Sequence, residues 1–221
     1  MDAKEIDKPR RGRPPDGSLA ERRRGEILEH AIRHFARAGF ASADLDAIVA
    51  DVGCAKGTVY RYFRNKEDLF HGAVDEVMRG LLEATSAVTS DDPIQQLEHA
   101  IVAYLTYFDE HPEFVELLIL ERAEFRTRKR PTYFDYREAS SGRWMVMFAE
   151  LMKSGRFRQM PPQHALDAIG NLLYGTIFTN YFVGRTHASK RHAAEIVDVL
   201  FRGLLTPAEA AQRDARRETD R

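Results

Sequence analysis

Apolar residues recur at steps of three and four along most of the chain. In one clear example, Ile27, Ala31, Phe35 and Ala38 fall on one side of a helical wheel. This spacing is typical of amphipathic helices, and no stretch shows the strict alternation of a strand. The pattern therefore predicts an all-α fold. Prolines and glycines interrupt it and divide the chain into about nine helices, expected at about 19–38, 45–52, 55–63, 66–88, 93–109, 112–127, 132–154, 163–184 and 189–205.

These expected helices fall into two groups. Those within 19–66 are predicted to form a small N-terminal domain, and the six longer ones within 67–205 a helical bundle. Residues 1–18 are rich in proline, glycine and basic side chains, which predicts a disordered basic arm. Residues 206–221 contain no aromatic side chain and mix acidic with basic residues, which predicts a flexible tail.

Composition limits the classes of protein that remain. Hydrophobic residues make up 43% of the chain, which is enough for a core and excludes a disordered protein. The 33 basic and 34 acidic residues give a net charge of −1, so any surface for nucleic acid must arise from local charge. The single cysteine excludes an intrachain disulfide and a cysteine-rich metal site, and it favours a reducing, cytoplasmic location. We expect no cofactor and no metal.

The longest uncharged stretch, 168–184, is slightly too short for a membrane span and contains asparagine and threonine. A helix buried between protein surfaces explains it better, and we expect no membrane partner. His30 and His34 stand four residues apart on the first expected helix. With no third ligand nearby, His34 is expected to be a packing residue and not part of a metal site.

Residues 45–70 have the pattern of a helix-turn-helix. Leu45 and Ile48 face inward on a first short helix, Gly53 permits a sharp turn, and Val59 and Phe63 anchor a second short helix. In this motif the second helix enters the major groove of DNA.

The outward face of the second helix carries hydroxyl and cationic side chains. Four basic residues and no acidic one lie between Lys56 and Lys66. Gly57 removes a side chain where the backbone would approach DNA, and Lys66 lies where it would reach a phosphate. The alternative is a solvated basic face on an ordinary pair of helices.

These residues resemble the TetR/AcrR-type transcriptional regulators. The resemblance covers 19–70 and is carried by Ile27, Leu28, Ala31, Phe35, Gly39, Phe40, Ile48, Gly53, Val59, Phe63, Leu69 and the residues of the second helix. It implies a homodimeric repressor in which a small molecule bound in the C-terminal bundle changes the spacing of two DNA-reading heads. The DNA-binding residues that it implies are Lys56, Gly57, Thr58, Tyr60, Arg61, Tyr62 and Lys66.

Two positions depart from the family pattern. The family usually opens the recognition helix with serine or threonine, whereas this chain has Ala55 and so lacks a capping oxygen there. Asp44 is suited to cap the preceding helix but would repel a phosphate, so Ser42 is the expected contact instead.

The basic arm adds a second candidate for DNA contact. Arg11, Gly12, Arg13 and Pro14 resemble the core of an AT-hook, in which arginines enter a narrow, A·T-rich minor groove. We therefore include Arg11 and Arg13 among the candidate DNA-binding residues. A solvated tail is the alternative.

The expected bundle contains most of the aromatic residues, which would line a chamber for a small-molecule effector of unknown identity. An ordinary core is the alternative for most of them, and a surface ion-pair network is the alternative for the polar candidates around Glu121. The candidate ligand-binding residues are Tyr104, Phe108, Leu118, Arg122, Phe125, Trp144, Phe148, Tyr174 and Phe178.

The expected helix over 163–184 is apolar on nearly all sides, so it needs cover on more than one face. With the helix over 189–205 it is the expected homodimer surface, where Gly170 and Gly175 would permit close crossing. The function predicted is a ligand-responsive repressor, released by its effector from a pseudo-palindromic, double-stranded DNA operator. A helix-turn-helix architectural protein that senses no ligand is the alternative. The chain has no GxSxG, HExxH, Walker A or GxGxxG motif, so we expect no enzyme.

Overall fold

The computed structural model describes residues 17–185 and 190–219. Within these ranges it contains ten α-helices and no strand, which confirms the all-α prediction. The helices are α1 (Gly17–Ser42), α2 (Leu45–Val52), α3 (Lys56–Tyr62), α4 (Lys66–Ala87), α5 (Pro93–Glu110), α6 (Pro112–Glu124), α7 (Thr132–Lys153), α8 (Pro162–Phe182), α9 (Lys190–Leu204) and α10 (Pro207–Thr219).

Local signals in the sequence set most of the helix ends. The side chains of Asp44, Asn65 and Asp92 accept hydrogen bonds from backbone N–H groups in the first turns of α2, α4 and α5. Gly53 ends α2 in the left-handed region, with φ 66°, where a side chain would be strained. Gly39, with φ 76°, interrupts α1 near the end expected for the first helix, and a last helical turn follows it.

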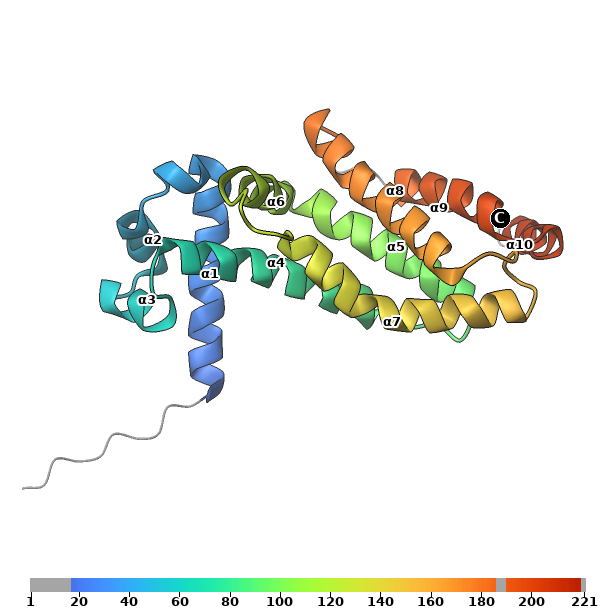
Figure 1. The fold of residues 1–221 in the computed structure, drawn as a ribbon, viewed down its shortest axis with the longest axis horizontal. Coiled ribbons are helices and arrows are strands. Elements are labelled where there is room, and N and C mark those ends of the chain that lie inside the picture. The colour runs from blue at the N-terminus through green and yellow to red at the C-terminus, as the bar shows by residue number, and fades with distance from the viewer. Residues whose placement is uncertain (1–16, 186–189, 220–221) are drawn as a thin grey trace, which may run out of the picture.

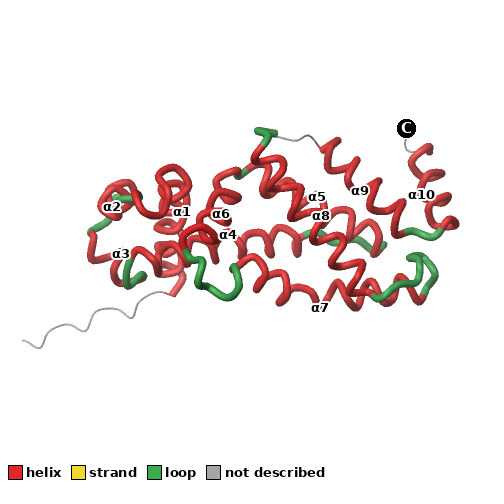
Figure 2. The backbone as a smooth tube through the Cα atoms, turned by 45° about the horizontal axis from the view of Figure 1, so that its top comes forward, coloured by secondary structure: helices red, strands yellow, loops and turns green. Residues whose placement is uncertain are grey.

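The two shortest helices, α2 and α3, lie with α1 at one end of an elongated molecule (Figure 1). We call α1–α3 the head. Helix α4 starts beside α3 and runs from the head into the bundle formed by α5–α9, so it is continuous between the two regions. Short loops join most of the helices (Figure 2). None of the described helices combines the length and the apolar character that crossing a membrane requires.

A cluster of Phe40, Phe70, His71 and Phe125, which we call the aromatic joint, connects the head to the bundle. The ring of Phe125, at the end of α6, lies 5.0 Å from Phe40 of α1 and 5.4 Å from Phe70 of α4, measured between centroids. The imidazole of His71 is 4.6 Å from the same ring. Phe70 is fully buried, so α1, α4 and the end of α6 are closely packed against one another here.

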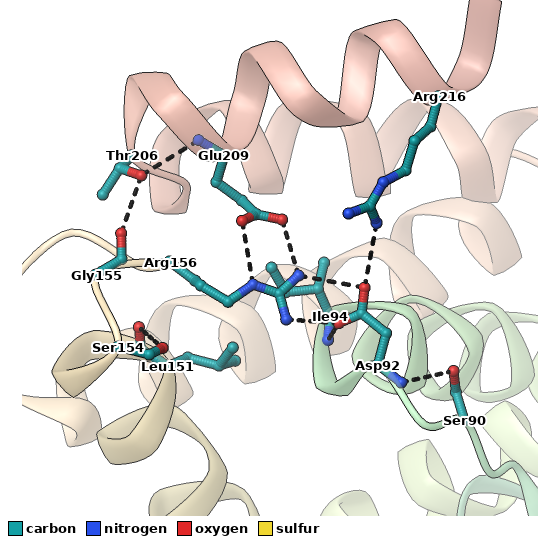
Figure 3. A network of polar contacts seen from close by, with 10 residues as sticks. All are labelled: Ser90, Asp92, Ile94, Leu151, Ser154, Gly155, Arg156, Thr206, Glu209 and Arg216. Carbon is teal, nitrogen blue, oxygen red and sulfur yellow. Dashed lines mark hydrogen bonds and ion pairs between the residues drawn. The ribbon is translucent and has the colours of Figure 1, made fainter. Parts of the chain in front are cut away.

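The C-terminal segment differs from the expected flexible tail, because residues 207–219 form helix α10 (Figure 3). Arg156, in the α7–α8 loop, donates to Glu209 of α10 at 2.8 and 3.1 Å and to Asp92 at 2.8 and 3.2 Å. Arg216 of α10 lies 3.6 Å from the same Asp92 carboxylate. These partners are distant in sequence, so a reading of local composition could not detect them.

Candidate functional site

The turn between α2 and α3 presents α3 at the surface of the head. Ile48 of α2 is fully buried, and Val59 and Phe63 anchor α3 in the same core. The backbone N–H of Gly53 donates to the carbonyl of Ala50 at 3.0 Å, which closes the turn. Because the apolar side of α3 packs on this core, its opposite side faces solvent or a partner.

The outward side of α3 carries most of the residues singled out from the sequence. Lys56, Gly57, Tyr60 and Arg61 are exposed, whereas Thr58 is half-buried. Tyr60 is 45% exposed, so its ring and hydroxyl are accessible to a partner.

Helix α3 begins without a side-chain cap. Ala55 offers no acceptor, and the N–H of Thr58 donates to the carbonyl of Ala55 at 2.7 Å instead. The first N–H groups of α3 therefore have no capping side chain.

Two of the cationic side chains are already engaged within the head. Lys56 forms an ion pair with Asp46 of α2, and this hydrogen bond raises the pKa of Lys56. The guanidinium of Arg61 lies 5.2 Å from the ring centre of Tyr62 and donates to its hydroxyl at 3.3 Å. Both contacts are exposed and screened by solvent, so they are weak. They orient the two cations, and a phosphate could replace them at little cost in free energy.

Lys66 and Ser42 lie where the end of α1 meets the start of α4. The ammonium of Lys66 donates to the carbonyl of Ala41 at 2.9 Å and lies 5.2 Å from the ring centre of Phe40. Two of its three N–H donors remain for another acceptor. Ser42 is exposed as the last residue of α1. Arg11 and Arg13 lie outside the described residues.

A histidine–carboxylate contact ties α1 to α2. The Nε2 of His34, which is buried, lies 2.6 Å from the Oδ2 of Asp51. The hydrogen bond with His34 lowers the pKa of Asp51. His34 thus takes part in holding the head together.

A cavity of about 130 Å³ lies within the bundle. Helices α4, α5, α7 and α8 form its walls, and most of the lining is apolar. The lining residues are Met78, Leu81, Leu82, Thr85, Leu97, Ala100, Ile101, Tyr104, Tyr133, Tyr136, Arg137, Ser140, Arg143, Trp144, Phe148, Leu166, Ile169, Gly170 and Leu173.

Two tyrosine hydroxyls meet at this cavity. The hydroxyls of Tyr104 and Tyr133 lie 2.9 Å apart, and burial raises the pKa of both phenols. Both therefore stay protonated at neutral pH. The pair has two protons and uses one in its mutual hydrogen bond, so the other is available to an acceptor.

An uncharged stripe runs along the outer side of α8. Its exposed members are Ala168, Leu172, Gly175, Thr179 and Phe182, spaced three or four residues apart. Val199 of α9 is 70% exposed, and a Cβ added at Gly175 would meet no atom within 4 Å. Gly170, which was expected to permit helix crossing as well, instead makes room for the guanidinium of Arg137.

Comparison with known proteins identifies the head. Residues 27–73 match the family described as "Bacterial regulatory proteins, tetR family". The HTH-type transcriptional repressor SCO4008 of Streptomyces coelicolor is 35% identical over 111 residues, which cover 50% of this chain and 55% of that protein. Residues 27–73 of this chain therefore match the tetR family.

Two further matches concern a second curated repressor and a solved structure. The HTH-type transcriptional repressor NicS of Pseudomonas putida is 30% identical over 46% of this chain and 49% of its own length. The chain thus spans about half the length of these two curated relatives. The fatty acid degradation regulator FadR of Bacillus halodurans has the same fold, with a TM-score of 0.69, 17% identity, and coverage of 86% of this chain and 97% of its own.

The match to this family confirms the resemblance found in the sequence, and the curated relatives that match are named as transcriptional repressors. The family match covers residues 27–73, whereas the similarity of fold to FadR covers 86% of this chain.

The ligand-binding residues expected from the sequence are distributed over several places. Tyr104, Trp144 and Phe148 line the cavity. The others lie outside its lining: Phe125 in the aromatic joint, Leu118, Arg122 and Tyr174 around the α6–α7 loop, Phe108 beside α8, and Phe178 against Tyr174.

Sequence reasoning missed the polar part of the cavity wall. The missed residues are Arg137, Ser140 and Arg143, which recur every three residues on α7 and line the cavity together with Tyr133 and Trp144. That spacing was visible in the sequence. The charged cluster around Glu121 is the more conspicuous set of polar residues in the sequence, but Glu121 binds Arg128 at 2.8 Å and the N-terminus of α7.

Proposed function

We propose that the chain is a ligand-responsive transcriptional repressor that binds a pseudo-palindromic DNA operator as a homodimer and releases it when a small molecule enters the bundle. The observation that carries this proposal is the outward side of α3. It combines exposed Lys56, Tyr60 and Arg61 with a glycine that has open space around it.

The side chains of α3 divide into two roles. Arg61 and Tyr60 are the candidates for base edges in the major groove, since arginine pairs with guanine through two parallel hydrogen bonds. Lys56, Lys66 and Ser42 lie at the ends of helices and are the candidates for phosphate contacts, which fix the register of the head on the duplex. Thr58 and Tyr62 supply hydroxyl groups between the residues of these two roles.

The domain boundaries follow from these roles. We propose 19–66 as the DNA-binding domain and 67–205 as the bundle for effector binding and dimerisation. A protein whose target is operator DNA belongs in the cytoplasm. The basic arm with Arg11 and Arg13 remains a proposed minor-groove contact.

A two-fold dimer through α8 and α9 is supported by the uncharged stripe on α8. Phe182 and Val183 at the end of α8, Leu172 and Val199 are half of the large hydrophobic side chains exposed in the described ranges. Pairing these helices with those of a second copy would bury the stripe and direct two heads toward one duplex.

A chain of polar contacts runs from the cavity wall toward the head. Thr132, next to Tyr133 of the wall, donates its hydroxyl to buried Glu121 at 2.6 Å. Glu121 also accepts from Arg128, which in turn reaches the imidazole of His71 at 3.2 Å.

His71 packs against Phe125 in the aromatic joint. A ligand that displaces Tyr133 is therefore expected to alter the contact between α6 and α4. The ligand favours the released state only as far as it binds that state more tightly.

The test is selection of DNA from a random-sequence pool with the full chain. The selected sites should contain inverted half-sites whose centres lie about 34–36 Å apart, one helical turn, and the complex should contain at least one dimer. A pool in which no sequence is enriched would refute the reading role of α3. Enrichment with no change on addition of any compound from a broad screen would favour an architectural protein that senses no ligand.

A further inference from the structure

The walls of the cavity carry positive charge and hydrogen-bond donors. Its charged lining residues are Arg137 and Arg143, and no carboxylate is found among the residues that line it within the described ranges. The other polar groups there are hydroxyls and an indole. Because guanidinium and indole groups only donate, the cavity favours a ligand that supplies acceptor atoms and negative charge.

The charge of Arg137 is already balanced. Its guanidinium donates to the carboxylate of Asp167 at 3.2 Å and to the amide oxygen of Asn171 at 2.9 Å. It also packs closely on Gly170, where an added Cβ would lie 2.6 Å from its Cζ. Arg137 therefore connects α7 to α8 through these contacts.

The charge of Arg143 is not balanced by a carboxylate in this way. It donates to the hydroxyl of Ser86 at 2.9 Å and to the carbonyl of Thr85 at 3.5 Å, and both partners are neutral. No ion pair to Arg143 exists in the part of the chain that the structure describes. Partial burial accordingly lowers the pKa of Arg143, since no carboxylate offsets the loss of solvent. Three of its five N–H donors remain unused by these two contacts.

Size sets a second limit on the ligand. The cavity volume is about 130 Å³. An apolar cavity of about 150 Å³ is known to hold one benzene molecule. The apolar body of a ligand that fits without rearrangement is therefore a single ring or a short aliphatic chain.

We propose that the cavity takes a small monocarboxylate, with a compact apolar body between α4, α5 and α8 and its carboxylate at the guanidinium of Arg143. This inference rests on the proposed function, because it names the chemical class of the effector for the same cavity. A carboxylate matches the fork of N–H groups on a guanidinium, and its single charge matches the single unbalanced cation.

The position of Arg143 also connects the ligand to the head. Its two present acceptors, Thr85 and Ser86, belong to the last turn of α4, whose first turn carries Lys66 beside α3. A carboxylate that pairs with Arg143 and takes it from these acceptors changes the contact between α7 and the end of α4. Helix α4 is thus the element through which this ligand would act on DNA binding.

The experiment is isothermal titration of the full chain with pairs of carboxylates and their neutral amides. Benzoate is compared with benzamide, and hexanoate with hexanamide; benzylamine serves as a cationic probe of the same size. We expect the carboxylates to bind at least about tenfold more tightly than their amides, and to weaken as salt is raised while the amides do not.

Variants assign the effect to one side chain. Arg143→Gln should weaken carboxylates about tenfold and leave the amides unchanged, and Arg143→Lys should restore part of the difference. Arg126→Gln is the matched control, since Arg126 is also an exposed arginine that donates to a carbonyl at the end of a helix. Thermal unfolding of each variant verifies that it folds.

Amides or benzylamine that bind as tightly as benzoate would overturn the inference, and so would the absence of binding by any probe or an effect of Arg126→Gln as large as that of Arg143→Gln. None of these results bears on DNA binding, which is measured without ligand. Carboxylate binding that leaves operator affinity unchanged would refute the ligand response of the proposed function while this inference stands.

Discussion

Substitution of Gly57 by alanine should affect the stability of the protein and its affinity for DNA differently. Gly57 is the second residue of α3, and a Cβ built on it meets no atom within 4 Å. Alanine is favoured over glycine in a helix by about 0.5–1 kcal/mol. The variant should therefore be more stable than the wild type, with Tm raised by roughly 2–4 °C for each kcal/mol gained in a chain of this size.

The same methyl group should harm DNA binding. If α3 lies in the major groove, the open space at Gly57 is filled by the duplex, and an extra methyl group in a close-packed contact costs about 1–3 kcal/mol. That corresponds to a loss of affinity of roughly five- to hundredfold. Stability and affinity are thus predicted to change in opposite directions.

The assay combines thermal unfolding with fluorescence anisotropy on a selected DNA site. Gly142→Ala is the matched control, because a Cβ at Gly142 in α7 also meets no atom within 4 Å, yet α7 lies in the bundle. The control should gain stability and keep its DNA affinity. If Gly57→Ala binds DNA within about twofold of the wild type, a difference well below the estimate for a packed methyl group, α3 does not approach DNA as argued.

Three further predictions concern other regions. Lys66→Ala should weaken binding to all DNA sequences about equally and reduce the slope of log K against log salt by about 1, measured by anisotropy at several salt concentrations; an unchanged slope would remove Lys66 from the phosphate contacts. Val199→Asp should give a monomer in sedimentation velocity, whereas Val146→Asp, on α7 and 67% exposed, should remain a dimer; two variants of equal mass would contradict the dimer surface. Arg156→Met should lower the free energy of unfolding by about 1–3 kcal/mol at pH 7, because Glu209 and Asp92 both lose their hydrogen bonds to the guanidinium and Asp92 keeps only the longer contact with Arg216. The hydrogen bond from Arg156 lowers the pKa of Asp92, so this contribution is present above pH of about 4 and is lost as the pH falls below it; thermal melts at pH 7 and pH 3 that show the same difference would contradict the network.

Signals within a few residues of each helix end explain why the fold was predictable from the sequence. Proline opens α5, α6 and α8 at Pro93, Pro112 and Pro162, and Gly53 ends α2. Such residues act on the local backbone whatever the tertiary structure, so the helix boundaries and the α2–α3 turn followed directly.

Contacts between distant segments explain what the sequence did not reveal. Helix α10 depends on Arg156, which lies 53 residues before Glu209 and is joined to it by two hydrogen bonds. Phe125 and Phe148 are both aromatic residues of the bundle, yet the first packs in the joint with the head and the second lines the cavity. Only the packing of four helices decides which aromatic side chains surround a space.

The most direct test of the central claim is the base preference of Arg61→Ala. Affinities of the wild type and the variant would be measured on the selected site and on all its single-base changes. The account predicts that the variant loses discrimination, by about 1–3 kcal/mol, at one or two base pairs placed symmetrically in the two half-sites, and keeps it elsewhere. A profile identical to that of the wild type, or a uniform loss at every position, would contradict the claim that α3 reads the bases.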